Sequence, residues 1–247
     1  MLPDSISPIF AVLVIVVSFF TSGISAAVGI GGGVAMLAVL SFGLPATSLI
    51  PIHGVIQLGS NTGRTFIQRA HINWKPVLQF SIGALFGGIA GGLLVQDLPD
   101  FWLKLTIGLF ILFSVWGPKP NYPNHSAIFV ITGTLSTLLT MFVGATGPFV
   151  AAVFKTRNLD RLGTVASHTA CMTLQHGIKI GIFIGLGFDF VPFIPLLLAM
   201  IGAGYLGTMV GTKLLHAFSE IRFKQMFNLV LTGMALLIIA RSLFTLL

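Results

Sequence analysis

Long apolar stretches recur eight times along the chain, and they limit what it can fold into. Each is close to the ~20 residues that an α-helix needs to cross the hydrocarbon core of a bilayer. Only 8% of the residues are charged, against about 25% in an average soluble domain. The chain is therefore expected to be one all-α, polytopic integral membrane protein. The stretches are Ile9–Ile30, Leu49–Ile67, Val77–Val95, Phe101–Val115, Ala127–Val143, Val165–Phe188, Phe193–Val210 and Phe227–Ala240.

The sequence also repeats itself at a spacing of 115 positions. The glycine cluster Gly29–Gly33 is followed at that spacing by a second cluster, Gly144–Pro148. Paired glycine-interrupted segments are typical of secondary transporters. We expect two structural repeats, residues 1–117 and 125–247, joined by a Pro-rich linker, residues 118–124. Polar residues in the helices after the clusters keep the spacing, and the pairs are His53 and His168, Asn61 and His176, and Arg64 and Lys179.

The positions of the basic residues predict how the helices are oriented. Lys and Arg gather in the loops 69–75, 155–161 and 213–224, which the positive-inside rule assigns to the cytoplasm. The loops around Asp97–Asp100 and Asp189 then lie outside. Matching segments of the two halves run in opposite directions under this assignment, so the repeat is expected to be inverted, as a bundle in the cytoplasmic (inner) membrane with a non-cytoplasmic N-terminus.

Each repeat is expected to consist of a Gly-broken helical hairpin followed by three transmembrane helices. In the hairpin a helix ends at the glycines and a shorter helix returns. Non-helical backbone at membrane depth survives only where it is buried in protein or lines a wet cavity. The restarting helix presents free N–H groups and the positive end of its dipole, which favours a small anion.

A tight turn between packed helices would need the same glycines, but two clusters at matching positions favour a binding site. The candidate backbone ligands are Gly31, Gly32 and Gly33 in the first repeat and Gly144, Thr146 and Gly147 in the second.

The helix after each cluster carries polar side chains on one face, at i, i+4 spacing. Ionisable residues inside a membrane are costly and are candidates for function. No carboxylate lies on either stripe, which favours an anionic substrate. The candidate substrate-binding side chains are His53, Gln57, Asn61 and Arg64 in the first repeat and His168, Gln175, His176 and Lys179 in the second.

Two questions about these side chains stay open. A single buried histidine is usually structural, but His53 and His168 occupy matching positions, and histidine changes charge near neutral pH. They are therefore candidates for coupling transport to protons. Arg64 and Lys179 lie toward the ends of their helices, where each would either supply countercharge or snorkel to the membrane interface.

Several classes of protein are excluded. The chain has no nucleophile, metalloprotease or dinucleotide-binding motif in the required context, so we expect no enzyme, cofactor or metal. Its net charge of +7 comes from short loops without interleaved aromatics, so nucleic acid is not an expected partner. The lone Cys171 lies in an apolar helix and is expected to be a packing residue.

Six segments of the chain carry a family resemblance: Gly29–Gly33, Thr47–Leu49, His71–Trp74, Gly83–Gly88, Gly144–Pro148 and Gly202–Gly207. These segments resemble those of the TauE/SafE family of membrane permeases, which is associated with the export of sulfite and organosulfonates. The resemblance spans nearly the whole chain. Asn73 stands where the family usually has an acidic residue, and Thr146 and Pro148 replace glycines.

The resemblance implies transport of a small sulfur-containing anion, such as sulfite, a sulfonate or a thiosulfate-like ion. Together with the inverted repeat it predicts a secondary transporter with a central site and alternating access, with proton coupling as a further hypothesis. A passive channel for a small solute and a non-transporting membrane scaffold are the alternatives. The anion and the lipid bilayer are the expected partners, and the sequence leaves the oligomeric state and the direction of transport open.

Overall fold

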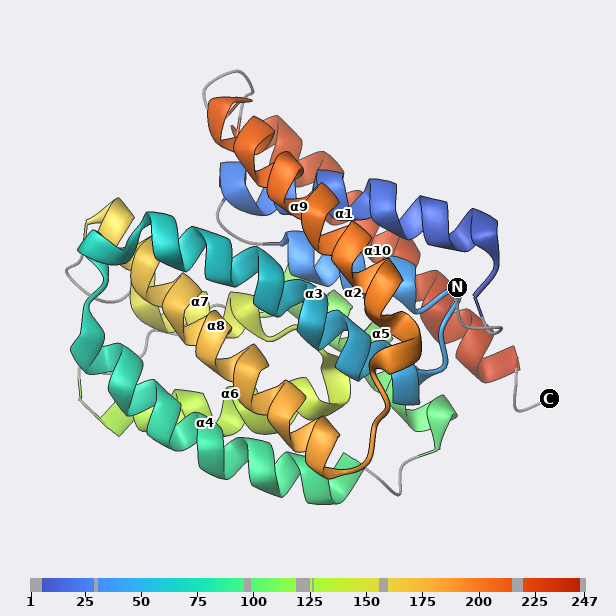
Figure 1. Ribbon diagram of the computed structural model, residues 1–247, viewed down its shortest axis with the longest axis horizontal. Helices are drawn as coiled ribbons and strands as arrows, with labels where there is room; N and C mark the ends of the chain where they lie inside the picture. The colour runs from blue at the N-terminus through green and yellow to red at the C-terminus, as the bar shows by residue number, and fades with distance from the viewer. Residues whose placement is uncertain are drawn as a thin grey trace. The chain divides into compact units, whose positions relative to one another are not determined.

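The computed structural model describes residues 6–28, 31–95, 99–118, 125, 127–155, 160–214 and 220–244. Within these residues the protein is all-helical, as expected, with ten α-helices (Figure 1). They are α1 (Pro8–Val28), α2 (Gly32–Leu40), α3 (Ala46–Ile67), α4 (Trp74–Val95), α5 (Asp100–Trp116), α6 (Ala127–Val143), α7 (Gly147–Lys155), α8 (Arg161–Gly185), α9 (Ile194–Leu214) and α10 (Glu220–Phe244). Short 3₁₀ turns lie at Arg69–His71 (η1) and Val191–Phe193 (η2).

Each of the eight predicted apolar stretches coincides with a long helix, and the two extra helices are the short arms of the predicted hairpins. Helices α2 and α7 each have 9 residues. At 1.5 Å per residue they are about 14 Å long, roughly half the hydrocarbon thickness. They pack against α1 and α6, respectively. Each turn contains a glycine with positive φ: Gly31, directly before α2, has φ 109°, and Gly144, directly after α6, has φ 79°. Residues 29 and 30 of the first cluster lie outside the described residues.

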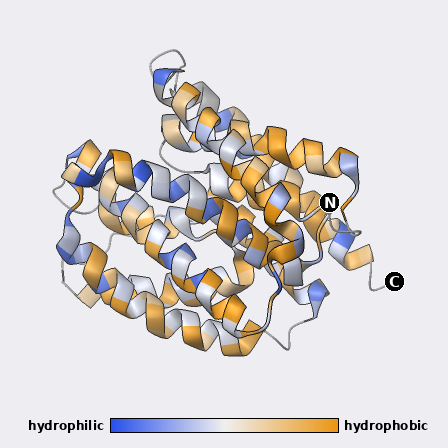
Figure 2. Cartoon of the chain, viewed as in Figure 1, coloured by the Kyte–Doolittle hydropathy of each residue, from blue (hydrophilic) through white to orange (hydrophobic). Residues whose placement is uncertain are grey.

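Within the described part of the chain, four helices are long and apolar enough to cross a membrane: α1, α4, α9 and α10. Helices α3 and α8 are equally long, with 22 and 25 residues, but polar residues interrupt them. Figure 2 shows this difference as apolar colour along α1 and α4 and mixed colour along α3 and α8. The polar residues are therefore concentrated on α3 and α8, which follow the short helices α2 and α7.

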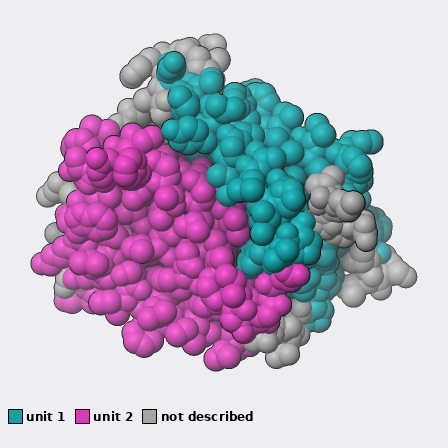
Figure 3. Space-filling view, in the orientation of Figure 1, with its two compact units in different colours: residues 1–53, 98–118, 190–247 teal, residues 54–97, 119–189 magenta. Residues whose placement is uncertain are grey.

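The chain forms two compact units, each taking helices from both halves of the sequence (Figure 3). Unit 1, residues 1–53, 98–118 and 190–247, contains α1, α2, α5, α9 and α10. Unit 2, residues 54–97 and 119–189, contains α4, α6, α7 and α8. Helix α3 contributes its residues through His53 to unit 1 and the rest to unit 2. Of the predicted linker, residues 119–124 lie outside the described residues.

In unit 1, α1 and α9 lie side by side and run parallel. Gly207 lies against the carbonyl of Phe19, and Gly211, one turn later, lies against Gly23. Small residues at this spacing let two helix backbones approach closely in lipid. Gly202 lies on another side of α9, where an added Cβ atom would meet nothing within 4 Å in the described part of the chain.

The other helix pair of unit 1, α5 and α10, is antiparallel. Gly108 on α5 lies close to Ala235 on α10. Two turns further along α5, Trp116 donates its indole N–H to the Thr232 hydroxyl, at 2.8 Å. Later residues of α5 therefore contact earlier residues of α10, as expected for antiparallel helices.

In unit 2, α4 and α6 lie side by side and also run parallel. Gly83 lies against the carbonyl of Val130, and Gly87, one turn later, lies against that of Thr134. On the other side of α4, Gly88 and Gly92 lie against Ile182 on α8. The glycines of α4 thus fit two neighbouring helices.

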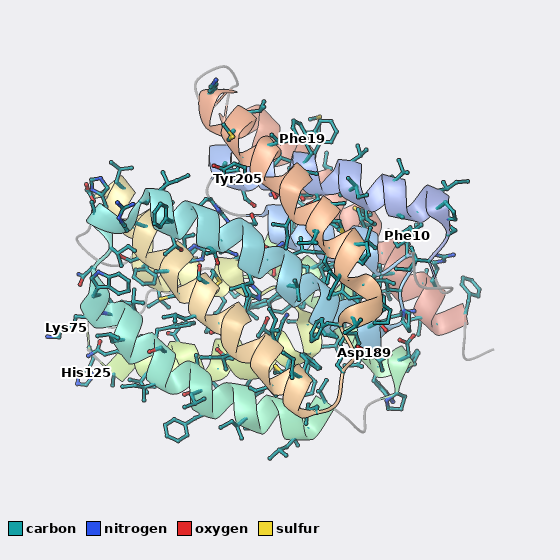
Figure 4. The ribbon with its side chains drawn as sticks, in the orientation of Figure 1. Phe10, Phe19, Lys75, His125, Asp189 and Tyr205 are labelled. Atoms are coloured by element: carbon teal, nitrogen blue, oxygen red, sulfur yellow. The ribbon has the colours of Figure 1, made fainter. Side chains whose placement is uncertain are left out.

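The two parallel pairs, α1 with α9 and α4 with α6, are counterparts in the sequence repeat. In each pair the first helix of one repeat packs on the fourth helix of the other. Figure 4 labels Phe19 and Tyr205 on the first pair, and it shows Lys75 and His125 together at the starting end of the second. Each unit is therefore held together by a helix exchanged between the halves.

The apolar core of unit 2 is formed by side chains from α4, α6, α7 and α8. Cys171 is buried in this core, as expected for a packing residue. The core residues are Ile72, Val77, Phe80, Ala84, Phe129, Val150, Val153, Phe154, Ala166, Ala170, Cys171 and Met172.

Candidate anion site

The predicted site residues divide between the two units, and each group has its own contacts. Unit 1 holds four of them: Gly31, Gly32 and Gly33 at the start of α2, and His53 on α3. Unit 2 holds Gln57, Asn61, Arg64, Gly144, Thr146, Gly147, His168, Gln175, His176 and Lys179.

Both predicted histidines hold the first turn of a short helix. His53 Nε2 lies 2.9 Å from the carbonyl oxygen of Gly33 in α2, and His168 Nε2 lies 3.0 Å from that of Gly147 in α7. A carbonyl oxygen only accepts, so Nε2 carries a hydrogen and donates it in each case. Both side chains are buried. The histidines therefore anchor the returning helix of each hairpin in equivalent ways.

In unit 2, the turn between α6 and α7 carries a carbonyl that accepts two side-chain hydrogen bonds. The Gly144 oxygen accepts from the Thr140 hydroxyl at 2.9 Å and from the Lys179 ammonium at 3.3 Å. One donor comes from α6 and the other from α8. The turn is thus fixed from both sides.

A second residue of α8, one turn before Lys179, reaches the same turn. Gln175 donates from Nε2 to the Thr146 hydroxyl at 2.6 Å, and its Oε1 accepts from the Ser136 hydroxyl at 3.4 Å. All three side chains are buried. Residues four apart on a helix share a face, so Gln175 and Lys179 together contact the residues before α7.

Lys179 is fully buried, and the residue opposite it on α3 is a glycine. A Cβ atom added at Gly54 would lie 2.7 Å from Lys179 Cε, so the missing side chain at position 54 leaves the space that the lysine fills. Within the described residues, Lys179 forms no ion pair, and the Gly144 carbonyl is its one hydrogen-bond acceptor. An ammonium buried without a carboxylate is costly unless an anion compensates it.

The matching cation of the first repeat, Arg64, is held differently. Its Nη2 donates to Asn61 Oδ1 at 2.8 Å, and Asn61 Nδ2 donates to the carbonyl of Gln57 at 2.8 Å. The Gln57 side chain is half-buried, and Arg64 is 8% exposed. The structure therefore places Arg64, like Lys179, inside the protein.

The unit 2 part of α3 runs antiparallel to α8. Near one end Gly54 lies against Lys179, and near the other the hydroxyls of Thr65 and Thr173 are hydrogen-bonded at 2.9 Å. Asn61 on α3 and His176 on α8 both lie between these two contacts. The two polar stripes thus run alongside each other.

Sequence reasoning missed the hydroxyl groups of α6 that complete this arrangement. Ser136 and Thr140 contact Gln175 and the Gly144 carbonyl, and both are buried. The 115-residue spacing relates them to Thr21 and Ser25 on α1. Extending the repeat upstream of the glycine clusters would have found them.

These observations define a class of protein. The chain is a multi-pass membrane protein whose interior carries a buried ammonium next to the start of a short helix. Comparison with protein-family profiles matches residues 14–238 to "Sulfite exporter TauE/SafE", and the chain belongs to this family. No curated protein and no solved structure matches it. The family consists of membrane transporters of sulfur anions, so the protein is a transporter and not an enzyme.

Proposed function

We propose that the protein is a secondary transporter that carries a small sulfur-containing anion, such as sulfite or a sulfonate, across the cytoplasmic membrane by alternating access. The observation that carries the proposal is the buried Lys179 ammonium, held 3.3 Å from the Gly144 carbonyl with no acidic partner among the described residues. The start of α7, three residues further on, adds N–H donors and a positive dipole end. The anion binds there, within unit 2.

The directions of the packed helix pairs support the inverted repeat of residues 1–117 and 125–247. The loop charges direct α3 and α5 inward and α4, α8 and α10 outward. The same loop charges predict that α1, the first arm of the first hairpin, is parallel to α9. They also predict that α6, the first arm of the second hairpin, is parallel to α4. Within each unit, α1 and α9 are parallel, α4 and α6 are parallel, and α5 and α10 are antiparallel. These directions agree with the inverted repeat, and the non-cytoplasmic N-terminus rests on the loop charges alone.

Thermal unfolding of the purified protein in detergent tests the anion site directly. We expect one or two sulfur anions from a panel of sulfite, thiosulfate, sulfoacetate, taurine, sulfate, phosphate and acetate to raise the unfolding midpoint. A ligand at 100 times its dissociation constant stabilises the folded state by about 2.7 kcal/mol. If no anion shifts the midpoint, the site has been assigned wrongly and the scaffold alternative gains support.

Transport in proteoliposomes then separates a transporter from a channel. Uptake of the anion that stabilises the protein is expected to saturate with concentration and to show counterflow. A channel would give non-saturating flux with no counterflow.

Proton coupling through His53 and His168 is a further part of the proposal. The double variant His53→Gln, His168→Gln removes both titrating groups but keeps an amide N–H that can donate to the Gly33 and Gly147 carbonyls. We expect its unfolding free energy to stay within about 1 kcal/mol of the wild type, the scale of one hydrogen bond. We expect anion flux to lose its response to an imposed pH gradient. A response that persists unchanged in a stable double variant would eliminate these histidines as the coupling groups.

A further inference from the structure

Two hydrogen bonds of Gln175 form a chain in which each group donates to the next, and the last acceptor is Thr146 at the start of α7. The Ser136 hydroxyl donates to Gln175 Oε1, and Gln175 Nε2 donates to Thr146 Oγ1. Thr146 Oγ1 is thereby used as an acceptor, so its own hydrogen is available to donate. Chains of hydrogen bonds polarise one another and strengthen the last donor. Thr146 is buried, with 1% of its surface exposed, and its hydroxyl is thus held as a donor.

The backbone before α7 adds further donors. The first hydrogen bonds of this helix run from Phe149 and Val150 to the Thr146 carbonyl, so the N–H groups of Thr146 and Gly147 precede them. The first N–H groups of an α-helix have no acceptor within the helix. Pro148 has no N–H to contribute.

Four carbonyl oxygens around the same turn, those of Val143, Gly144, Thr146 and Gly147, are already used as acceptors. The Val143 carbonyl accepts from the Ala145 N–H. Gly144 accepts from two side chains, Thr146 accepts from two N–H groups, and Gly147 accepts from His168. The groups that remain for a ligand therefore include three kinds of donor: the Thr146 hydroxyl, backbone N–H groups and the Lys179 ammonium.

We propose that this donor set selects fully deprotonated oxyanions, such as a sulfonate or the doubly charged form of sulfite, and rejects anions whose oxygens carry a proton. An O–H group on the ligand would face another donor and lose its hydrogen bond in a buried site, which is costly. Thr146 is the residue that sets this selectivity, and Gln175 is a positioning residue that keeps its hydroxyl donating. The proposal rests on the proposed anion site in unit 2.

Ionisable groups of the protein must be separated from those of the ligand in any test. The elements around the turn carry Lys155 on α7, Arg161, His168, Cys171, His176 and Lys179 on α8, and Arg64 on the unit 2 part of α3, and α6 has no titratable residue. Their protonation would alter the binding of every anion in the same direction. Sulfite gains a proton as the pH falls through neutrality, whereas methanesulfonate stays deprotonated. Comparing these two anions therefore distinguishes titration of the ligand from titration of the protein.

The experiment measures dissociation constants for sulfite and methanesulfonate by thermal shift at pH 6 and pH 8. For the wild type, we expect the affinity for sulfite to rise from pH 6 to pH 8 by a factor that is at least several-fold larger than the change in affinity for methanesulfonate. For Thr146→Val, which keeps the shape but removes the donor, we expect about 10- to 100-fold weaker binding of both anions, the range for a lost hydrogen bond to a charged group. Thr146→Ser, which keeps the hydroxyl, is the matched control and should bind within a few-fold of the wild type.

Gln175→Glu tests the relay itself. Its carboxylate would accept from the Thr146 hydroxyl and turn that hydrogen away from the ligand, so binding should weaken as much as in Thr146→Val. The proposal is overturned if sulfite and methanesulfonate share one pH dependence, if methanesulfonate fails to bind where sulfite binds, or if a stably folded Thr146→Val binds as tightly as Thr146→Ser. A wild type that no anion stabilises contradicts the proposed function instead, so the two failures are distinguishable.

Discussion

Replacing Lys179 with methionine is expected to weaken anion binding by about 100- to 1,000-fold while raising the stability of the ligand-free protein. An ion pair at 4 Å is worth roughly 4 kcal/mol at an effective dielectric constant of 20, which corresponds to about three orders of magnitude in affinity. Without a ligand the same ammonium is a buried charge with no acidic partner among the described residues. Replacing such a charge with an apolar side chain of similar length removes a desolvation penalty.

Thermal unfolding with and without sulfite measures both effects on one sample. Lys104→Met is the matched control, because Lys104 pairs with Asp100 at 2.9 Å at the start of α5, and sulfite binding should not change. Gly54→Ala keeps the charge but fills the space beside Lys179 Cε, so a smaller loss of affinity is expected. Unchanged sulfite binding by a folded Lys179→Met protein would remove Lys179 from the site.

The second large effect is expected from a single methyl group on α9. Gly207→Ala places a Cβ on the backbone carbonyl of Phe19, and neither helix can relax without separating. Overpacking of this kind costs about 1–3 kcal/mol. The usual gain of about 1 kcal/mol for Gly→Ala in a helix offsets only part of it. We expect a clearly lower unfolding midpoint and a larger fraction of aggregated protein on size-exclusion chromatography.

Gly202→Ala provides the control on the same helix. A Cβ at position 202 would meet no atom within 4 Å in the described part of the chain, so this change should leave the midpoint unchanged or raise it slightly. Equal midpoints for the two variants would mean that α1 and α9 do not pack through Gly207.

Much of the fold could be predicted from the sequence, because the lengths of the apolar stretches and the glycine clusters that interrupt them are local signals. The long helices and the short returning arms follow from such signals. The partners of the helices do not, since nothing in the periodicity of α4 specifies α6 rather than a helix of its own half. Side-chain partners are equally distant in sequence: Gln175 lies 39 residues from Ser136 and 29 from Thr146.

The different roles of Arg64 and Lys179 could not be predicted from their matching positions either. Three residues before Arg64 lies Asn61, whose amide oxygen accepts from the guanidinium. Three residues before Lys179 lies His176, and the ammonium instead contacts the Gly144 carbonyl. The repeat fixes where a cation lies, and one neighbouring residue decides what it contacts.

The exchange of helices between the halves has a consequence for how the protein is made. Ser18 on α1 donates to the Met200 carbonyl across 182 residues of sequence. At a synthesis rate of about 5–20 residues per second, α1 waits roughly 10–40 s for α9 to leave the ribosome. During that interval the serine and glycine face of α1 is in the bilayer without its final neighbour. The first half of the chain alone therefore lacks the packing partner of α1 and does not contain all the helices of unit 1.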